Sequence, residues 1–360
     1  MFALCLAGND IRVIESDAFS VARFWDERVE RRVTMTSCNL GHVDPDSFRS
    51  LPGLTSLRVS DNRGLSRSGL LAAVRDIATL KKLDTSSGCS VFQRSFDLAD
   101  LFSTHLGLRL TELVVTGNGI RTVGANLSTA AEVDTIRSLD LTNNELATLG
   151  GGLLELRHLE RLVVKGNRLS RLTGGSVAGL DRLVSLDVSE NQLEIVDEGA
   201  LRSLTRLRHV DLAGNRIRTL SASALPPDVQ SLTVADNRLG GVPFMAGLGH
   251  LRSVDASGNS LARLDAHVFS ARRHFRSSPP ISANFSRNEI SSVDGSAFSD
   301  VEFSVLDLAR NRISRLSHYG ARAVGVLRAD DNIISDVDDQ AFQTSKIRPG
   351  NIPMKTNLQL

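Results

Sequence analysis

Short apolar–polar–apolar stretches recur along almost the whole chain, and each is followed three residues later by the same polar position. The pattern is L-x-x-L-x-L-x-x-N-x-L, and it is clearest in residues 159–169, 183–193 and 207–217. An alternating stretch of this kind predicts a short strand whose two apolar side chains point to one face. The chain is therefore predicted to be a series of strand-containing repeats rather than two or three separate globular domains.

Aligned on the asparagine, the sequence contains fourteen copies, spaced 21 to 30 residues apart. Cys38 and Gly88 occupy the aligned position in two copies, and asparagine occupies it in the other twelve. We expect one solenoid of about fourteen copies over residues 1–345, incomplete at both ends, and a weak partial repeat or tail over 346–360. The asparagines are Asn9, Asn62, Asn118, Asn144, Asn167, Asn191, Asn215, Asn237, Asn259, Asn288, Asn311 and Asn332.

Each recurring position in the copy has an expected structural role. The asparagine amide is expected to bond backbone groups of its own turn and of the neighbouring coil, which would otherwise be buried without partners. Cys38 is a tolerated substitute at this position, whereas Gly88 predicts an irregular coil. Aliphatic residues follow two and five positions later, and a large apolar residue follows ten positions later. In five copies that last residue is phenylalanine, namely Phe19, Phe48, Phe269, Phe298 and Phe342.

These features predict an α/β solenoid, a leucine-rich-repeat horseshoe. Parallel strands are expected on its concave face, and irregular or short helical segments on its convex side. Strands packed about 4.8 Å apart set the inner spacing, while the outer segments are bulkier, so such a stack is expected to bend.

Charge and motifs exclude several classes of function. The chain has 42 Lys+Arg against 41 Asp+Glu, which argues against nucleic-acid binding, because that binding requires concentrated positive charge. No apolar run is long enough to span a bilayer. Cys5, Cys38 and Cys89 form neither a disulfide framework nor a zinc pattern. Residues 174–178 approach a nucleophile elbow but lack its last glycine, so no enzyme, cofactor or metal is predicted.

The 24-residue copies with a phenylalanine ten residues after the asparagine resemble the typical class of extracellular leucine-rich repeats. Repeats of this class occur in Toll ectodomains, in Slit and in chaoptin-like adhesion proteins. The resemblance covers residues 1 to about 345. It implies a secreted or cell-surface protein that binds a protein ligand through its concave face, as a receptor ectodomain, adhesion protein or matrix component. The alternative is an intracellular scaffold or regulatory subunit, and a third hypothesis is an enzyme whose catalytic domain lies outside this chain.

The polar residue between the two strand leucines should point out from the concave face. Along the stack this position forms a broken acidic stripe, flanked by Arg161, Lys165 and His209. One interpretation is a docking surface for a basic partner. The other is that L-D-L is simply a habit of these repeats. The stripe consists of Asp140, Asp187, Asp211, Asp255 and Asp307.

A second charged row consists of the residues that directly follow the asparagine. Such a row can bind sulfated glycans or an acidic protein face, or it can be an ordinary solvated edge of the stack. Its arginines are Arg63, Arg168, Arg216, Arg238 and Arg312.

Two N-glycosylation sequons begin at Asn126 and Asn284. Asn126 is expected on an exposed loop after a strand. Asn284 is expected on the concave strand face, where a glycan would obstruct ligand binding nearby.

Overall fold

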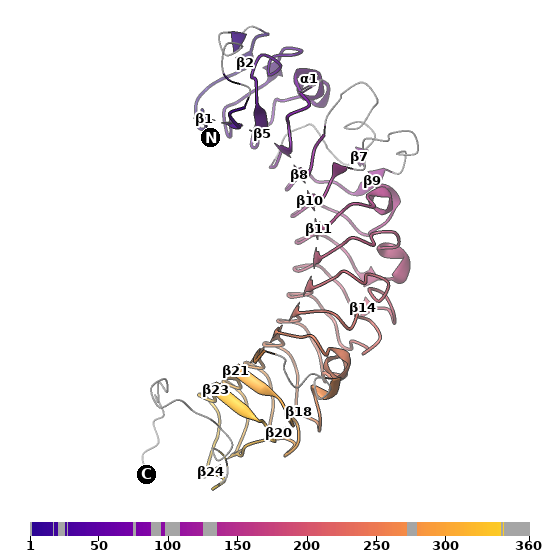
Figure 1. Cartoon of the computed structure of the whole chain (residues 1–360), viewed down its shortest axis with the longest axis vertical. Helices are drawn as coiled ribbons and strands as arrows, with labels where there is room; N and C mark the ends of the chain where they lie inside the picture. The colour runs from indigo at the N-terminus through magenta and orange to yellow at the C-terminus, as the bar shows by residue number, and fades with distance from the viewer. Residues whose placement is uncertain are drawn as a thin grey trace. The chain divides into compact units, whose positions relative to one another are not determined.

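The structure is a computed structural model of the whole chain (Figure 1), and it divides into two compact units. Unit 1 is Met1–Leu169 with Gly175–Leu183, and unit 2 is Ser170–Gly174 with Val184–Leu360. The structure describes residues 2–16, 18–20, 26, 28–74, 77–87, 95–97, 109–124, 135–271, 279–339 and 341.

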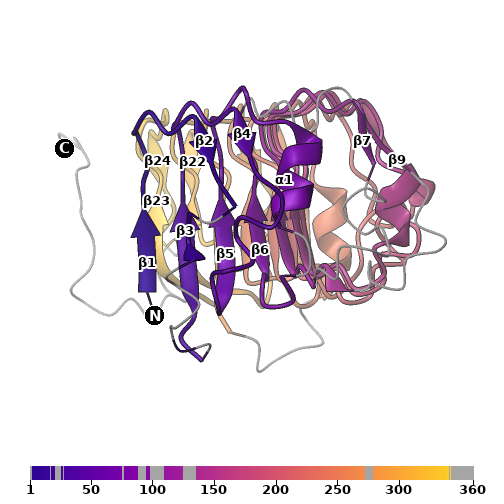
Figure 2. The same cartoon turned by 90° about the horizontal axis from the view of Figure 1, so that it is seen from above.

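Each unit contains a parallel sheet with one strand for each expected copy of the repeat. In both units neighbouring strands pair in parallel, with Leu139 beside Leu162 in unit 1 and Val210 beside Leu232 in unit 2. Figure 2 shows β1, β3, β5 and β6 side by side in this arrangement. In unit 1 the strands are β1 (Phe2–Cys5), β3 (Arg31–Thr34), β5 (Leu54–Arg58), β6 (Lys82–Asp84), β8 (Glu112–Val114), β10 (Ser138–Asp140) and β11 (Arg161–Val163). In unit 2 they are β13 (Ser185–Asp187), β15 (His209–Asp211), β16 (Ser231–Thr233), β17 (Ser253–Asp255), β19 (Ile281–Asn284), β21 (Glu302–Asp307) and β23 (Ala323–Arg328).

The return segments of the coils contain short strand pairs and little helix, as expected. The helix α1 (Arg67–Ala73) begins after Ser66, whose Oγ accepts a hydrogen bond from the Gly69 N–H at 3.1 Å. The 3₁₀ segments are η5 (Gly151–Glu155), η6 (Gly174–Ser176) and η7 (Pro243–Gly247). The paired short strands are β2 (Val13–Ile14) with β4 (His42–Val43), β7 (Ser95–Asp97) with β9 (Thr122–Gly124), β12 (Arg171–Leu172) with β14 (Ile195–Val196), β18 (Arg263–Leu264) with β20 (Ser292–Val293), and β22 (Arg315–Leu316) with β24 (Asp336–Val337).

The core of each unit is built from the predicted apolar positions. Between the first and last copies most strand leucines are buried, and so are most aliphatic residues two and five positions after the asparagine, such as Leu169 and Leu172. In the terminal copies Leu4 and Leu327 are half-buried and Val337 is exposed. Phe48, Phe269 and Phe298 are at most 1% exposed, which confirms the phenylalanine spine at these copies. Phe19 is only half-buried and stacks on Phe48 at 5.7 Å between ring centroids. The fifth position of the spine, residue 342, lies outside the described residues.

The asparagines form the expected hydrogen-bonded ladder. Asn215 donates from Nδ2 to the Val188 carbonyl at 3.1 Å and to the Leu212 carbonyl at 2.9 Å, and its Oδ1 accepts from the Leu193 N–H at 2.9 Å. One amide thus joins its own turn to the preceding coil. Asn9 and Asn332, in the first and last copies, are less buried than the ladder residues between them.

Cys38 fills the ladder position by a weaker version of the same contacts. Its Sγ, which is fully buried, contacts the Leu6 carbonyl at 3.1 Å and the Thr36 carbonyl at 3.5 Å. A thiol has one weak donor, whereas an amide has two strong donors and an acceptor. Cys38 is therefore a substitute in the ladder, as the sequence indicated. The other substitute, Gly88, lies outside the described residues.

The residue directly before the ladder position has a left-handed backbone in all fourteen copies, with φ between 52° and 76°. Glycine occupies five of these positions, at Gly8, Gly117, Gly166, Gly214 and Gly258. An ordinary side chain in this conformation costs about 1–2 kcal/mol, and asparagine or aspartate costs less. The nine other residues are Ser37, Asp61, Ser87, Asn143, Glu190, Asp236, Arg287, Arg310 and Asp331.

Candidate functional site

The outward-pointing acidic residues of the strands have a structural role in every coil where they occur. In each case Oδ1 accepts a hydrogen bond from the backbone N–H two residues later, which closes a turn at the end of the strand. Asn284 does the same in its own copy, at 3.0 Å from the Ser286 N–H. The backbone N–H groups that donate to these carboxylates are those of Ser86 to Asp84, Thr142 to Asp140, Ser189 to Asp187, Ala213 to Asp211, Ser257 to Asp255 and Ala309 to Asp307, at 2.9–3.1 Å.

These turn contacts support the interpretation of L-D-L as a habit of the repeat, because the aspartate stabilises the turn whether or not a partner binds. They also leave the second carboxylate oxygen, Oδ2, for other contacts. For three of these aspartates, Oδ2 contacts a side chain on the adjacent strand. The pairs are Arg58 with Asp84 at 2.7 Å, Asn284 with Asp255 at 3.2 Å and Arg328 with Asp307 at 3.4 Å.

Asp187 and Asp211 are in-register neighbours as well, on β13 and β15, but they differ from these pairs because both are acidic. Two carboxylates directly opposite each other repel. Exposed His209 lies on the same face as Asp211, two residues earlier on β15. The strand face of unit 2 thus combines Asp187, His209, Asp211, Asp255 and Asp307, with its negative charge concentrated at β13 and β15.

The remaining predicted face residues belong to unit 1. Asp140 lies between Val114 and Val163 in the sheet register. Arg161 is exposed at the start of β11, and Lys165 is half-buried beyond its end. The predicted residues are therefore divided between the two units, and we assign the candidate site to the strand face of unit 2.

The row of arginines after the ladder positions is an edge of mixed charge. Arg168 pairs with Glu145 at 3.0 Å, Arg312 pairs with Glu289 at 3.0 Å, and Arg216 lies 3.9 Å from Glu194. These side chains are about half exposed, and ion pairs of this kind contribute about 0–1 kcal/mol each. The pairing supports the interpretation of this row as a solvated edge.

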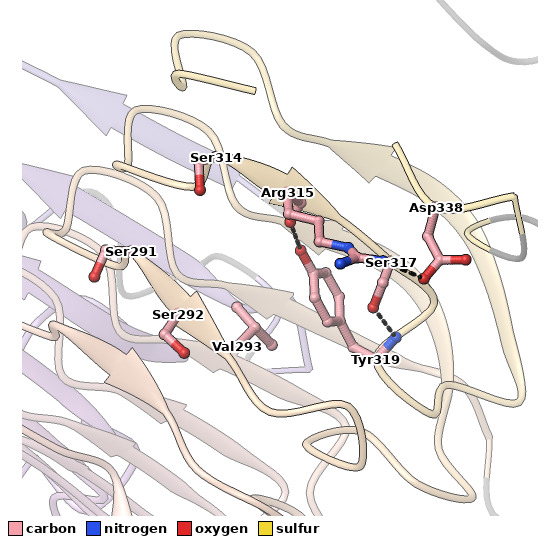
Figure 3. Close-up of a pocket in the computed structure, with 8 residues that line it drawn as sticks. All are labelled: Ser291, Ser292, Val293, Ser314, Arg315, Ser317, Tyr319 and Asp338. Atoms are coloured by element: carbon pink, nitrogen blue, oxygen red, sulfur yellow. Dashed lines mark hydrogen bonds and ion pairs between the residues drawn. The ribbon is translucent and has the colours of Figure 1, made fainter. Parts of the chain in front are cut away.

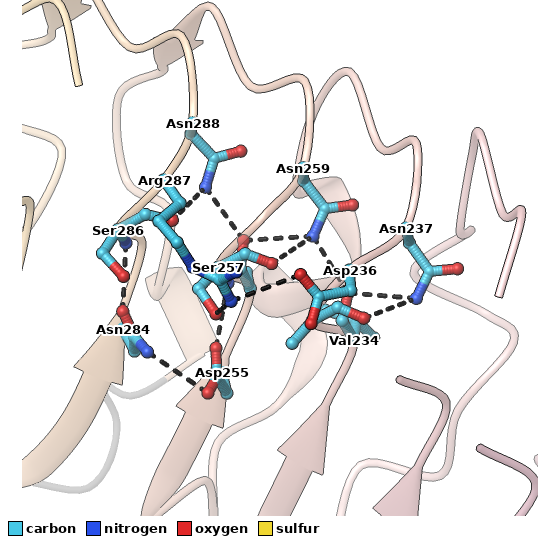
Figure 4. Close-up of polar contacts among 12 residues, drawn as sticks. Val234, Asp236, Asn237, Asp255, Ser257, Asn259, Asn284, Ser286, Arg287 and Asn288 are labelled. Carbon is cyan, nitrogen blue, oxygen red and sulfur yellow. Dashed lines mark hydrogen bonds and ion pairs between the residues drawn. The ribbon is translucent and has the colours of Figure 1, made fainter. Parts of the chain in front are cut away.

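Only one of the two sequon asparagines, Asn284, lies within the described residues. Asn126 lies outside the described residues. Asn284 lies at the end of β19 on the strand face, as expected, and is half-buried. The next residue, Phe285, is fully buried, and the amide of Asn284 contacts both Ser286 and Asp255. Figure 4 shows this contact beside the ladder asparagines.

A small polar pocket of about 300 Å³ lies on the return side of unit 2 (Figure 3). Tyr319 donates from its hydroxyl to the Arg315 carbonyl at 2.7 Å, and burial raises the pKa of this phenol. Arg315 pairs with Asp338 at 3.2 Å. The lining also contains Ser291, Ser292, Val293, Ser314 and Ser317.

Metal-binding clusters and membrane-spanning helices are both absent from the described part of the chain. No group of three or more His, Cys, Asp or Glu side chains there is placed to hold a metal ion. Within the same residues, no helix has the length and apolar character needed to cross a membrane.

Comparison with known proteins identifies the repeat type. The family model described as leucine rich repeat matches residues 134–193 and 157–217. No curated protein matches the chain.

Several solved structures share the fold. The chain is similar to Drosophila Toll in the Toll–Spatzle complex, with 20% identity, a TM-score of 0.61, and coverage of 87% of this chain and 44% of that one. For the glycosylated form of that complex the identity is 16% and the TM-score is 0.66, and the match covers 96% of this chain and 49% of that one. The chain therefore spans less than half the length of the Toll chain that it matches.

An internalin from Listeria monocytogenes is 17% identical over 93% of this chain and 86% of its own, with a TM-score of 0.52. The regular strands, the asparagine ladder, the family match and these shared folds lead to one conclusion: the chain is a leucine-rich-repeat protein.

Proposed function

We propose that this chain is a non-catalytic binding domain of a secreted or cell-surface protein, and that it binds a basic protein partner through the strand face of unit 2. The observation that carries the proposal is the in-register pair Asp187 and Asp211, with Asp255 two strands further on. The turn contact of Asp187 uses Oδ1, so a partner can approach its Oδ2 without breaking the turn. Asp211 and Asp255 also make their turn contacts through Oδ1, and Oδ2 of Asp255 accepts from Asn284 as well. A lysine or arginine placed there would relieve the repulsion between the two carboxylates.

The similarity to Toll supports the extracellular part of the proposal, because the Toll structure is a complex with the protein Spatzle. By analogy, this chain acts as part of a receptor or adhesion protein that holds a protein ligand.

A second candidate is an intracellular scaffold or regulatory subunit. It is favoured by the thiols, because exposed Cys5 and buried Cys38 are both free in the structure. Free cysteines are commoner in reducing compartments than in secreted proteins.

The two candidates differ in glycosylation. We would express the full-length protein in its own cell type and treat it with a glycosidase, using Asn126→Gln and Asn284→Gln as controls. A mobility shift that Asn126→Gln removes supports the secreted candidate. A cytosolic product without a shift would favour the scaffold.

The binding surface is tested separately, by screening the purified protein against a panel of extracellular domains of differing net charge. For any domain that binds, replacing Asp187, Asp211 and Asp255 together with asparagine should weaken binding and reduce its dependence on salt. The matched control replaces Glu145, Glu194 and Glu289 with glutamine, which removes the same charge from the arginine edge. Equal affinity and salt dependence in both variants would contradict the use of the strand face.

A further inference from the structure

Three arginines surround a hollow of about 380 Å³ at the strand ends of the repeats that contain β19, β21 and β23. Arg287, Arg310 and Arg328 come from three successive coils of unit 2, and small Ala309 lies between them. Asp307 and Asp330 complete the charged lining, so arginines outnumber aspartates by three to two. We call this feature the arginine hollow. The outward-pointing strand aspartates of unit 2 are Asp187, Asp211, Asp255 and Asp307, and we call them the acidic column. The arginine hollow lies at the end of this column, since Asp307 belongs to both.

The contacts that these arginines make within the described residues are long, and the arginine side chains are 49–66% exposed. Asp307, which pairs with Arg328, is itself largely buried. Arg287 Nη2 lies 3.2 Å from Asp236 Oδ1, across the intervening coil (Figure 4). Arg310 Nε lies 3.3 Å from Asp331 Oδ2, and Arg328 Nη1 lies 3.4 Å from Asp307 Oδ2. Each of these ion pairs uses one nitrogen of a guanidinium that carries five N–H donors. Exposed single contacts of this kind are weak, so a ligand oxyanion can replace them with little loss.

Two of these arginines lie at the left-handed position of the repeat. Arg287 and Arg310 have φ of 56° and 55°, at the position where five other copies have glycine. A long side chain in the left-handed region destabilises the turn relative to glycine. Nine of the fourteen copies have a residue other than glycine there, so this backbone belongs to the repeat. Arg287 and Arg310 are distinguished by lining one hollow together from successive coils.

We propose that the arginine hollow binds a carboxylate of the same protein partner whose basic group meets the acidic column. The proposal rests on the function proposed above and adds a second contact of opposite charge. A guanidinium pair presents donors in the geometry that a carboxylate accepts. The aspartates of the lining disfavour a long polyanion, because its further charges would be repelled.

The spacing of the strands sets the separation of the two contacts. Neighbouring strands lie about 4.8 Å apart, so six steps separate β13 from β23 by about 29 Å, and three steps separate β17 from β23 by about 14 Å. The partner should therefore carry a basic group and an acidic group about 15–30 Å apart. This arrangement fixes the direction in which the partner lies along the face.

The test uses two labelled peptides and the purified chain at low ionic strength. One peptide has a run of lysines, a flexible Gly/Ser spacer and two terminal aspartates, and the other has asparagines in place of the aspartates. The aspartate peptide should bind the unaltered chain about tenfold more tightly, a typical gain for one charge-assisted contact. In a variant with Arg287→Gly, Arg310→Gly and Arg328→Gln, the two peptides should bind equally.

The matched control is Glu190→Gly, which relaxes the same backbone position in unit 2 but removes no arginine. It should keep the tenfold difference. Arg310→Gly alone should reduce the difference while raising the Tm by about 1–4 °C, because glycine relieves the strained turn. A structural role for Arg310 would predict a lower Tm instead.

Two outcomes would overturn the proposal. One is equal binding of the two peptides to the unaltered chain, and the other is a difference that survives in the arginine variant. If the lysine segment binds but the aspartates add nothing, only the arginine hollow fails. If neither peptide binds, the proposed use of the strand face fails as well. Tighter binding of a sulfated oligosaccharide than of the aspartate peptide, lost in the arginine variant, would assign the hollow to another ligand class.

Discussion

Asn284 donates from Nδ2 to Asp255 Oδ2 on the neighbouring strand at 3.2 Å, while its own Oδ1 accepts from the backbone two residues ahead. The chain itself thus contains an asparagine in the acidic column, and it closes the same turn as the aspartates do. The turn at the end of a strand requires a side-chain oxygen at this position and does not require a charge. Turn stability and surface charge can therefore be separated by substitution.

The first prediction concerns Asp187. Asp187→Asn should leave the free energy of unfolding nearly unchanged, because the amide oxygen can still accept from the Ser189 N–H, 2.9 Å from the present carboxylate. Asp187→Ala removes the acceptor and should cost about 1 kcal/mol. Urea unfolding followed by circular dichroism measures both values. Equal destabilisation by the two substitutions would show that the charge, and not the turn contact, stabilises this position.

The repeat register could be read from the sequence because the core positions obey one physical rule in every copy. Leucines and asparagines recur where a stacked coil must exclude water and pair its backbone groups. The turn contacts of the aspartates were not predicted, although a signal was present: serine or threonine stands two residues after Asp140, Asp187 and Asp255, as turns of this type favour.

Other features could not be read in the same way. The left-handed position before the ladder is occupied by glycine, aspartate, serine, asparagine, glutamate and arginine, so no single residue type marks it. Glycine before asparagine in five copies was the available signal, and it was missed. The arginine hollow depends on three coils meeting at one edge, with Arg328 reaching it from a different position of the repeat than Arg287 and Arg310. The three arginines come together because the coils stack, and the order of residues within a single repeat does not reveal it.

The second prediction uses Cys38 as a natural precedent. Asn215→Ala should destabilise unit 2 by about 1–3 kcal/mol, because the Leu193 N–H loses its acceptor and the Val188 and Leu212 carbonyls each lose one donor. Those carbonyls keep their bonds from Asn191 and Asn237, respectively. Asn215→Cys should cost less than Asn215→Ala, since a buried thiol can contact the carbonyls as Cys38 does. Urea midpoints of the two variants give the comparison. A cysteine variant no more stable than the alanine variant would contradict this account of Cys38.

The third prediction compares two glycines with the same backbone. Gly258 and Gly214 have φ of 63° and 65°, so alanine is strained at both. An added Cβ would lie 2.2 Å from Asp236 Oδ1 at Gly258, but 3.3 Å from the flexible Glu190 Cγ at Gly214. Gly258→Ala must also displace Asp236 from its ion pair with Arg287. We expect about 1 kcal/mol of destabilisation for Gly214→Ala and about 2 kcal/mol for Gly258→Ala in thermal unfolding. Equal costs would mean that the Asp236 side chain moves away freely.

The fourth prediction concerns acid stability and Asp294. Its carboxylate accepts from the Ser296 Oγ at 2.6 Å and from the Ser296 N–H at 2.8 Å, and these bonds hold the pKa of Asp294 below its usual value of 3.8. A carboxyl with a lower pKa in the folded state stabilises the fold above its unfolded pKa. This stabilisation is lost as the pH falls through the folded value. Ser296→Ala removes the stronger bond, so the folded pKa of Asp294 should rise toward its unfolded value. The stability lost on acidification should therefore be smaller in this variant, because its folded and unfolded states bind protons over a more similar pH range. Urea midpoints between pH 5.5 and pH 3 measure this, with Asp294→Asn as the control in which Ser296→Ala should no longer change the pH dependence. If Ser296→Ala shifts the acid profile equally in the Asp294→Asn background, another carboxyl is responsible.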